Sequence, residues 1–211
     1  MSVELVTTDG IFSLDGEDFE VTNNIWIVGD DLEVVVIDAA HDHRRIVDAV
    51  GGRRVRQILL THGHNDHINA AGALADAVDA PISLHPDDTM LWEVVYPDRR
   101  VDIALAEGQV ISAGGHELGV LHTPGHAPGC CCFHDITSAT LYSGDTLFCG
   151  GPGATGRSFS DRPTILRAIR QRLLTLPDET VVHTGHGDST TIGNERELIE
   201  DLVRNELGAE G

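Results

Sequence analysis

The sequence predicts an α/β protein in which two β-sheets pack face to face and helices cover both outer surfaces. Short apolar runs separated by Gly, Asp and Asn predict a strand-rich block early in the chain, and the strand pattern restarts near Gln109. Apolar residues at helical spacing accompany both blocks. Because 41% of the 211 residues are hydrophobic, the chain can form a sizeable core, and we expect one domain over residues 1–211.

The first block is expected to begin as a small antiparallel meander and to continue as alternating helices and strands. Turn residues separate the extended runs of the meander, and helical spacing starts at Arg44. In chain order we expect strands at residues 10–14, 23–28 and 32–38, a helix from residue 44, a strand at 57–61, a helix at 69–78, a strand at 81–85 and a helix at 87–95.

The second block is expected to place its strands first and its helices later. Pro163 marks a helix start, and Ile165, Ile169 and Leu173 follow it at helical spacing. In chain order we expect extended segments at residues 109–124, 130–135 and 139–145, a Gly-rich loop at 150–156, a helix at 163–176, a strand at 180–183 and a helix at 194–207.

The chain is strongly acidic, with a formal charge of -20 from 34 acidic residues against 14 basic ones. Such a charge repels phosphate backbones and anionic lipid surfaces. We therefore expect a small-molecule substrate, and we expect neither nucleic acid nor a membrane as a partner. The sequence leaves the oligomeric state open.

The cysteines and the N-terminal segment favour a cytoplasmic protein. The first residues lack a basic stretch followed by an apolar core, and no apolar run approaches the roughly 18 residues that span a bilayer. Cys130, Cys131 and Cys132 are consecutive in a strand-like run, where neighbouring side chains face opposite ways and cannot easily pair. Reduced thiols in the cytoplasm fit this pattern better than a disulfide framework.

Residues 62–67 form the most informative motif, because they hold four metal-ligand side chains directly after an apolar run: His62, His64, Asp66 and His67. At a strand end, side chains two residues apart project to the same side, so the first two imidazoles can meet one metal. The other two side chains follow where the chain turns into a helix and can face a second metal. The alternative interpretation is a His-rich surface turn, which this spacing disfavours.

Three more ligand-type residues occur in matching surroundings later in the chain. His126, Asp145 and His186 each follow an apolar strand-like run and lie at a turn that contains Gly. A scaffold presents site residues at one edge of a sheet in this way. The remaining histidines are interpreted as surface or hydrogen-bonded side chains: His41, His43, His85, His116, His122, His134 and His183.

Together these motifs resemble the metallo-β-lactamase superfamily, and more narrowly its glyoxalase II-like hydrolases. The resemblance implies an αββα four-layer sandwich. It also implies two divalent metal ions, with zinc favoured, although His and Asp sites accept iron and manganese as well. The ligands that it implies are His62, His64 and His126 for the first metal, Asp66, His67 and His186 for the second, and Asp145 as the bridge between them.

Three further roles are suggested by position. Asp66 is expected to orient the attacking hydroxide besides binding metal. Asp38 ends an apolar run and resembles the acid that supports the site from behind the ligands, the alternative being an Asp that starts a turn. Arg157 lies in the loop after Asp145 and is a candidate to bind a substrate carboxylate, the alternative being a solvent-facing side chain.

The reaction that these residues imply is hydrolysis, in which a hydroxide bridging two metals attacks a carbonyl. The resemblance favours the thioester of a small thiol as the substrate. Glyoxalase II enzymes carry an additional helical region after the last His ligand that helps to bind glutathione, whereas only residues 187–211 follow His186 here. The identity of the thiol is therefore left open.

Other functions remain as alternatives. A persulfide dioxygenase-like oxidoreductase would use one iron on His62, His126 and Asp145, and a lactonase would use all seven ligands on an ester. The bridging Asp145 and the lack of a secretory signal disfavour a true β-lactamase. The acidic composition disfavours a nucleic-acid phosphodiesterase. Retention of every ligand disfavours a non-catalytic metal-binding module.

Overall fold

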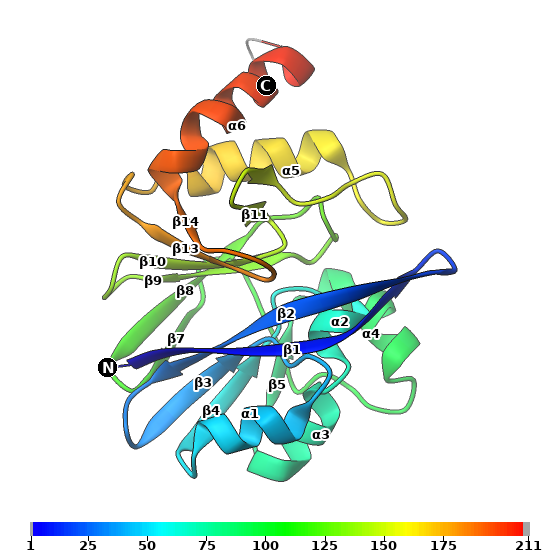
Figure 1. Ribbon diagram of the computed structural model, residues 1–211, viewed down its shortest axis with the longest axis vertical. Coiled ribbons are helices and arrows are strands. Elements are labelled where there is room, and N and C mark those ends of the chain that lie inside the picture. The colour runs from blue at the N-terminus through cyan, green and yellow to red at the C-terminus, as the bar shows by residue number, and fades with distance from the viewer. Residues whose placement is uncertain (1, 209–211) are drawn as a thin grey trace.

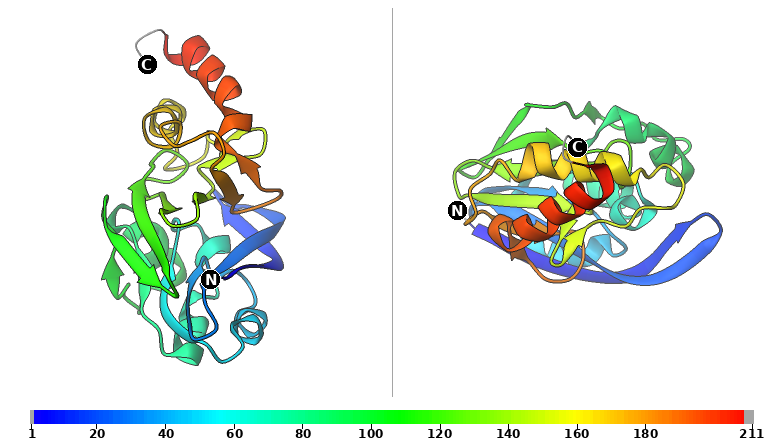
Figure 2. Two further views of the ribbon diagram at one scale, coloured as in Figure 1. Left: turned by 90° about the vertical axis from the view of Figure 1, so that its left-hand side faces the viewer. Right: turned by 90° about the horizontal axis from the view of Figure 1, so that it is seen from above.

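Two six-stranded sheets lie face to face, and helices cover the outer surface of each sheet (Figure 1). The computed structural model describes residues 2–208. Helices α5 and α6 lie on one outer side, and α1 and α3 lie on the opposite outer side, as the left view in Figure 2 also shows. This arrangement confirms the predicted αββα sandwich.

The first sheet is mixed and has the order β1-β2-β3-β4-β5-β6. Its first three strands pair antiparallel as the predicted meander, and the later pairs are parallel. Its strands are β1 (Ser2–Leu14), β2 (Glu17–Gly29), β3 (Glu33–Ile37), β4 (Arg54–Leu59), β5 (Ile82–Leu84) and β6 (Ile103–Ala104).

The second sheet has the order β14-β13-β10-β9-β8-β7, and its one parallel pair is β10 with β13. A small separate hairpin consists of β11 (Leu147–Phe148) and β12 (Gly151–Pro152). The strands of the sheet are β7 (Val110–Ala113), β8 (His116–His122), β9 (Cys131–Asp135), β10 (Thr140–Gly144), β13 (Val181–Thr184) and β14 (Thr190–Thr191).

The helices form the two outer layers. Those beside the first sheet are α1 (His43–Val50), α2 (Asn65–Ile68), α3 (Ala71–Val78) and α4 (Thr89–Val95), with a short 3-10 turn at Pro86–Asp88 before α4. Those beside the second sheet are α5 (Arg162–Ala168), the π-helical turn Ile169–Leu173 that continues it, and α6 (Ile192–Leu207).

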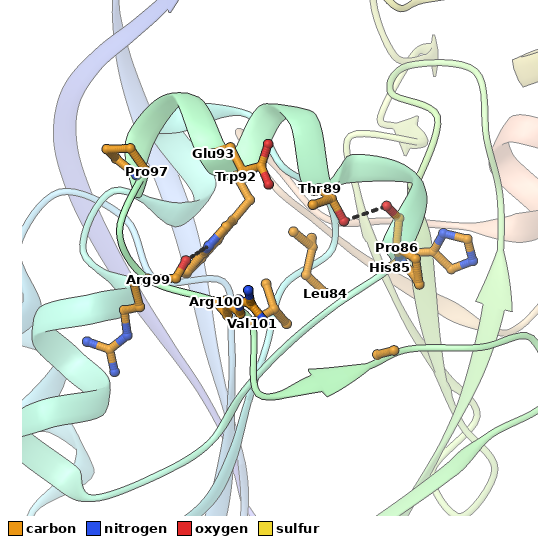
Figure 3. A pocket seen from close by; sticks show the side chains of 11 residues that line it. Leu84, His85, Pro86, Thr89, Trp92, Glu93, Pro97, Arg99, Arg100 and Val101 are labelled. Carbon is orange, nitrogen blue, oxygen red and sulfur yellow. Dashed lines mark hydrogen bonds between the residues drawn. The ribbon is translucent and has the colours of Figure 1, made fainter.

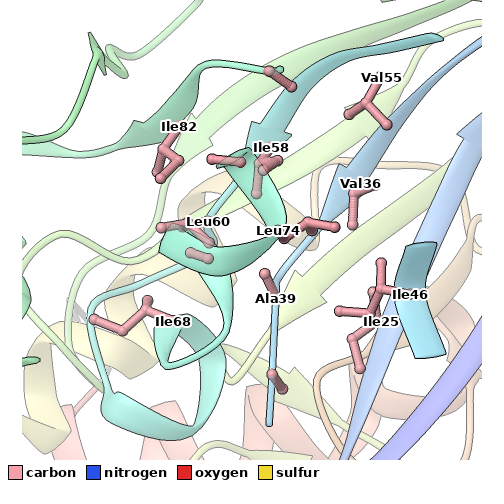
Figure 4. Packing of buried hydrophobic residues seen from close by; sticks show 14 of the residues in the cluster. Ile25, Val36, Ala39, Ile46, Val55, Ile58, Leu60, Ile68, Leu74 and Ile82 are labelled. Atoms are coloured by element: carbon pink, nitrogen blue, oxygen red, sulfur yellow. The ribbon is translucent and has the colours of Figure 1, made fainter. Parts of the chain in front are cut away.

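Strand β3 shows why apolar runs without alternation form central strands. Val34 and Val36 pack against the outer helices, whereas Val35 and Ile37 pack against the second sheet. Because successive side chains of a strand point to opposite faces, a strand that is buried on both faces must be apolar throughout. Figure 4 shows the helix-side layer, where Val36 faces side chains that come from the helices.

The boundaries of several elements differ from those predicted. Strands β1 and β2 have 13 residues each and form a long hairpin rather than two short strands, and the polar, exposed part of each strand hides the alternation in the sequence. The strand predicted to end at Thr61 ends at Leu59. The helix predicted at 69–78 is α3, which begins at Ala71, and the separate short helix α2 before it was not predicted. The two-residue strands β6, β11, β12 and β14 carry too few residues to produce a pattern.

The cysteines lie as the sequence predicted. Cys131 packs between the sheets and Cys132 packs on the side of α5, so their side chains face opposite ways. Cys130, Cys131, Cys132 and Cys149 are all free thiols. Within residues 2–208, no helix is long and apolar enough to cross a membrane.

Replacement of Ile58 by Ala tests the packing of the helix-side layer. The Ile58 side chain is 0% exposed in that layer (Figure 4), and a cavity at such a position costs about 2–5 kcal/mol of unfolding free energy. The matched control is Val94→Ala on α4, because Val94 is 81% exposed and its truncation should change stability by less than about 0.5 kcal/mol. Equal midpoints for both variants in urea denaturation would contradict this packing.

Candidate metal centre

The candidate ligands come together because several strands end at the same edge of the sandwich. His62 follows β4, His126 follows β8, Asp145 follows β10 and His186 follows β13. His62 and His64 lie in the loop after β4 rather than at the strand end itself. All seven side chains predicted as ligands lie close together here. They form two clusters, and a further group of possible ligands, His62, His67 and Asp145, combines one histidine of each cluster with Asp145.

His62, His64 and His126 form what we call the first cluster. Nδ1 of His64 lies 3.0 Å from Nε2 of His62 and 3.0 Å from Nε2 of His126. All three side chains are buried. Three ring nitrogens therefore converge on one point from two separate loops.

Asp66, His67 and His186 form the second cluster. The two Nε2 atoms of His67 and His186 lie 3.2 Å apart. Oδ2 of Asp66 lies 3.5 Å from Nε2 of His67 and 3.3 Å from Nε2 of His186. Two nitrogens and one carboxylate oxygen thus face a common point beside the first cluster.

Asp145 lies between the two clusters. Its Oδ2 is 3.5 Å from Nε2 of His126, and its Oδ1 is 3.3 Å from Nε2 of His67. Gly185 leaves room for this carboxylate, since a Cβ atom at that position would overlap Oδ1 of Asp145. The carboxylate is placed where a ligand shared by both clusters is needed.

Backbone carbonyls fix which ring nitrogen of two histidines is available. Nδ1 of His126 donates to the carbonyl oxygen of Ala154 at 2.8 Å, and Nδ1 of His186 donates to that of Thr22 at 2.8 Å. Because a carbonyl only accepts, each Nδ1 carries a proton, and Nε2 of each ring is directed to its cluster. This is the arrangement that metal-binding histidines have in proteins.

Asp38 lies behind both clusters. Its Oδ2 accepts a hydrogen bond from Nδ1 of His67 at 2.8 Å, and its Oδ1 accepts one from the backbone N–H of Thr61 at 2.8 Å. The hydroxyl of Thr61 also donates to Asp38 and lies 3.1 Å from Nδ1 of His62, from which it accepts. Asp38 thus orients one ring directly and a second ring through Thr61, which supports the role predicted for it.

The electrostatics keep two rings of the first cluster, those of His62 and His64, neutral. Burial and the neighbouring His126 lower the pKa of His64 to about 3. Burial also lowers the pKa of His62 well below its usual value. At neutral pH no proton competes with a metal for these lone pairs.

The second cluster carries excess negative charge. Burial alone would lower the pKa of His67, but the carboxylates of Asp145, Asp66 and Asp38 raise it well above its usual value. Burial alone would raise the pKa of Asp66, but neighbouring groups, His67 foremost among them, lower it to about 2. Three buried carboxylates around one ring attract positive charge to this point.

The donor set fits two divalent cations. Oδ1 of Asp66 and Oδ1 of Asp145 are buried and have no hydrogen-bond partner among the described residues. Unpaired buried acceptors and facing nitrogen lone pairs are both costly. A cation at each cluster would bind the facing nitrogens and neutralise the buried carboxylates, and imidazole with carboxylate suits zinc, iron and manganese.

An open cavity of about 390 Å³ gives access to both clusters. Apolar side chains line it beside the ligands, among them Phe12, Val21 and Phe148. Arg157 lies at the neighbouring small cavity, where its guanidinium contacts Glu17 at 2.7 Å and lies 4.6 Å from the ring centre of Phe19. These contacts join the loop to the β1–β2 hairpin, and the predicted contact of Arg157 with substrate stays a prediction.

Two side chains that were not predicted from the sequence, Asn23 and Phe12, also lie at the site. The amide of Asn23 donates to Oδ2 of Asp66 at 3.0 Å, and its carbonyl oxygen lies 2.9 Å from Nε2 of His41. The available signal was a pair of Asn residues in an otherwise apolar strand. No pattern distinguished Phe12, because only the folded hairpin brings it to within 5.3 Å of the ring of His64.

A third group of ligand-type residues, His85, Asp87 and His122, is less suited to a metal. The two rings stack with their centres 4.0 Å apart and their planes at 11°, so the lone pairs run side by side instead of converging. A cavity of about 480 Å³ adjoins this group and is lined by His85, Trp92 and other side chains (Figure 3). None of the seven predicted ligands lines that cavity.

Comparison with protein families decides the classification. Residues 19–186 match the model of the metallo-beta-lactamase superfamily, and this range includes both clusters. The chain belongs to the metallo-β-lactamase superfamily. The resemblance inferred from the motifs is thereby confirmed at the level of the superfamily.

Other members of the superfamily cover most of this chain. "Hydroxyacylglutathione hydrolase GloC" of Haemophilus influenzae is 31% identical over 190 residues, which are 82% of this chain and 87% of that protein. The di-iron-bound form of TTHA1623 is 34% identical to this chain, and the two structures superimpose with a TM-score of 0.74. The match covers 83% of this chain and 93% of the TTHA1623 chain. The BLEG-1 B3 metallo-β-lactamase is 27% identical with a TM-score of 0.76, covering 96% of this chain and 100% of its own.

Replacement of Asp38 by Asn tests the support behind the ligands. The neutral amide of Asn lacks the negative charge with which Asp38 accepts hydrogen bonds from the ring of His67 and the N–H of Thr61. We therefore expect zinc affinity to fall by about 10–100-fold. Competition with a chromophoric chelator measures this affinity. The control is Asp31→Asn, which removes one carboxylate at an exposed position; unchanged affinity in both variants would argue against a supporting role.

Proposed function

We propose that this protein is a binuclear metal-dependent hydrolase that cleaves the thioester of a small thiol. The observation that carries the proposal is the convergence of seven ligand-type side chains in two clusters with a carboxylate between them. The first metal would bind His62, His64 and His126, the second would bind Asp66, His67 and His186, and Asp145 would be shared. Zinc is our first expectation, and iron or manganese also suits these donors.

Two bound divalent ions would lower the pKa of a water molecule and polarise the substrate carbonyl. The chain's own residues orient the reaction. Asn23 holds Oδ2 of Asp66, and Oδ1 of the same carboxylate is buried without a hydrogen-bond partner among the described residues. Oδ1 is placed to accept a hydrogen bond from the attacking water and to hold its proton during attack on the carbonyl.

The cavity favours a small acyl group. Phe12, Val21 and Phe148 form an apolar part of the cavity lining beside the ligands. The guanidinium of Arg157 pairs with Glu17, so a substrate carboxylate would have to compete with that carboxylate. The name of the relative from Haemophilus influenzae states hydrolysis of hydroxyacylglutathione by that protein, which supports a thioester here and leaves the thiol to experiment.

We also propose the cytoplasm as the site of action and a small molecule as the substrate. The formal charge of -20 disfavours approach to nucleic acid and anionic lipid. The free thiols of the four cysteines suit a reducing compartment.

Metal content measured together with turnover tests the proposed reaction. Protein purified without chelator should contain about two metal ions per chain, and hydrolysis of a panel of acyl thioesters should rise as the second ion is restored to chelated protein. One iron per chain, no thioester hydrolysis and oxygen uptake with a persulfide would instead establish the dioxygenase alternative. Hydrolysis confined to lactones would mean that the substrate is an ester instead of a thioester, and the proposed binuclear metal centre would remain.

Replacement of Asp66 by Asn tests the proton-holding role. We expect kcat on the best thioester to fall by about 100-fold or more, because the amide cannot take the proton of the attacking water. Metal content must be measured in the same samples, so that loss of the ion is separated from loss of the base. Asp188→Asn, at an exposed position two residues after His186, is the matched control. Full metal content with full turnover in the Asp66 variant would eliminate this role.

A further inference from the structure

Asp88 is a buried carboxylate that none of the roles above uses. It ends the 3-10 turn Pro86–Asp88 and is 0% exposed. Its Oδ2 accepts the backbone N–H of Gly63 at 2.7 Å, and its Oδ1 accepts the backbone N–H of Gly129 at 2.5 Å. Both oxygens of one carboxylate are therefore bonded to the main chain of two different loops.

These two loops carry the whole first cluster. Gly63 lies between His62 and His64 in the loop that follows β4 of the first sheet. Gly129 lies three residues after His126 in the loop between β8 and β9 of the second sheet. Asp88 consequently connects the two sheets at the point where the ring nitrogens of His62, His64 and His126 must converge.

The packing around Asp88 admits only glycine at both contact positions. A Cβ atom on Gly129 would lie 2.7 Å from Cγ of Asp88. A Cβ atom on Gly63 would lie 3.0 Å from Cβ of Asp88 and 2.8 Å from Cβ of Leu91. The main chain of both loops thus lies against the side chain of Asp88 with no room for a Cβ atom at either glycine.

The surroundings make the two hydrogen bonds strong. Leu91, Ala127 and Cys130 form a small buried apolar cluster from α4 and the loop of His126. Burial raises the pKa of Asp88 to about 6, so the group is still ionised at neutral pH. Hydrogen bonds from N–H groups to a charged carboxylate in a poorly hydrated place are shorter and stronger than those to a neutral acceptor.

We propose that Asp88 is a positioning residue of the first metal site, because it holds the His62–His64 loop against the His126 loop. The inference rests on the proposed function only in that the first cluster binds a metal. It assigns Asp88 no contact with metal or substrate. The second cluster has no bond to Asp88 among the described residues, so its affinity for metal should not depend on this carboxylate.

Zinc affinity measured one cluster at a time tests the proposal. His186→Ala weakens the second cluster and leaves the first intact, and His64→Ala does the reverse. In the His186→Ala background, Asp88→Asn should lower zinc affinity by about tenfold or more in chelator competition. In the His64→Ala background the same change should have an effect of less than about twofold.

Two further variants separate positioning from general destabilisation. Gly129→Ala displaces Asp88 without removing any charge and should reproduce the loss in the first cluster. Asp135→Asn removes another buried carboxylate, one that bonds His116, Thr137 and Ser138 away from the clusters, and should leave zinc affinity unchanged even where it lowers the unfolding midpoint. The Co²⁺ absorption spectrum of each variant reports the ligand geometry independently of turnover.

Three results would overturn the proposal: unchanged zinc affinity of the first cluster in the Asp88 variant, equal losses in both clusters, or an equal loss in the Asp135 variant. The outcome is separable from the proposed reaction. Wild-type protein that binds two zinc ions without cleaving any thioester would contradict the proposed function, and the affinity differences would still decide the role of Asp88.

Discussion

The mutual approach of buried imidazole lone pairs is the constraint on which the rest of this structure depends. Nitrogens at 3.0 Å within the first cluster and 3.2 Å within the second repel one another unless a proton or a cation lies between them. The protein holds them there because the far nitrogens of His126, His186 and His67 are tied to a carbonyl or a carboxylate. Fixed acceptors behind the rings determine which face of each ring is presented, and that choice makes the site a metal-binding one.

The sandwich supplies the rigidity that this approach requires. Ligands come from loops of both sheets, so any sliding of one sheet on the other would separate them. The layer between the sheets, which includes Trp26, Ile37 and Phe133, is buried and opposes such sliding. Asp88 adds a polar connection at the very point where the loops of the first cluster meet. Apolar packing thus fixes the distance between sheets, and hydrogen bonds fix the final orientation of the side chains.

Much of this architecture could be predicted from the sequence because its signals are local. The spacing of residues 62–67 and the Gly turns at His126, Asp145 and His186 indicated the ligands, and apolar runs such as the one at residues 32–38 indicated strands. What the sequence did not disclose depends on contacts between distant segments. The carbonyls of Thr22 and Ala154 carry no side-chain signal, and the turn before α4 gave no sign that Asp88 reaches two loops.

The most direct test of the account is a crystal structure of the metal-loaded protein, with anomalous scattering recorded at the absorption edge of the bound metal. The account predicts two peaks about 3.5–4 Å apart, one among His62, His64 and His126 and the other among Asp66, His67 and His186, with Asp145 contacting both. A single peak, or a peak at His85 and His122 with none at these clusters, would contradict it.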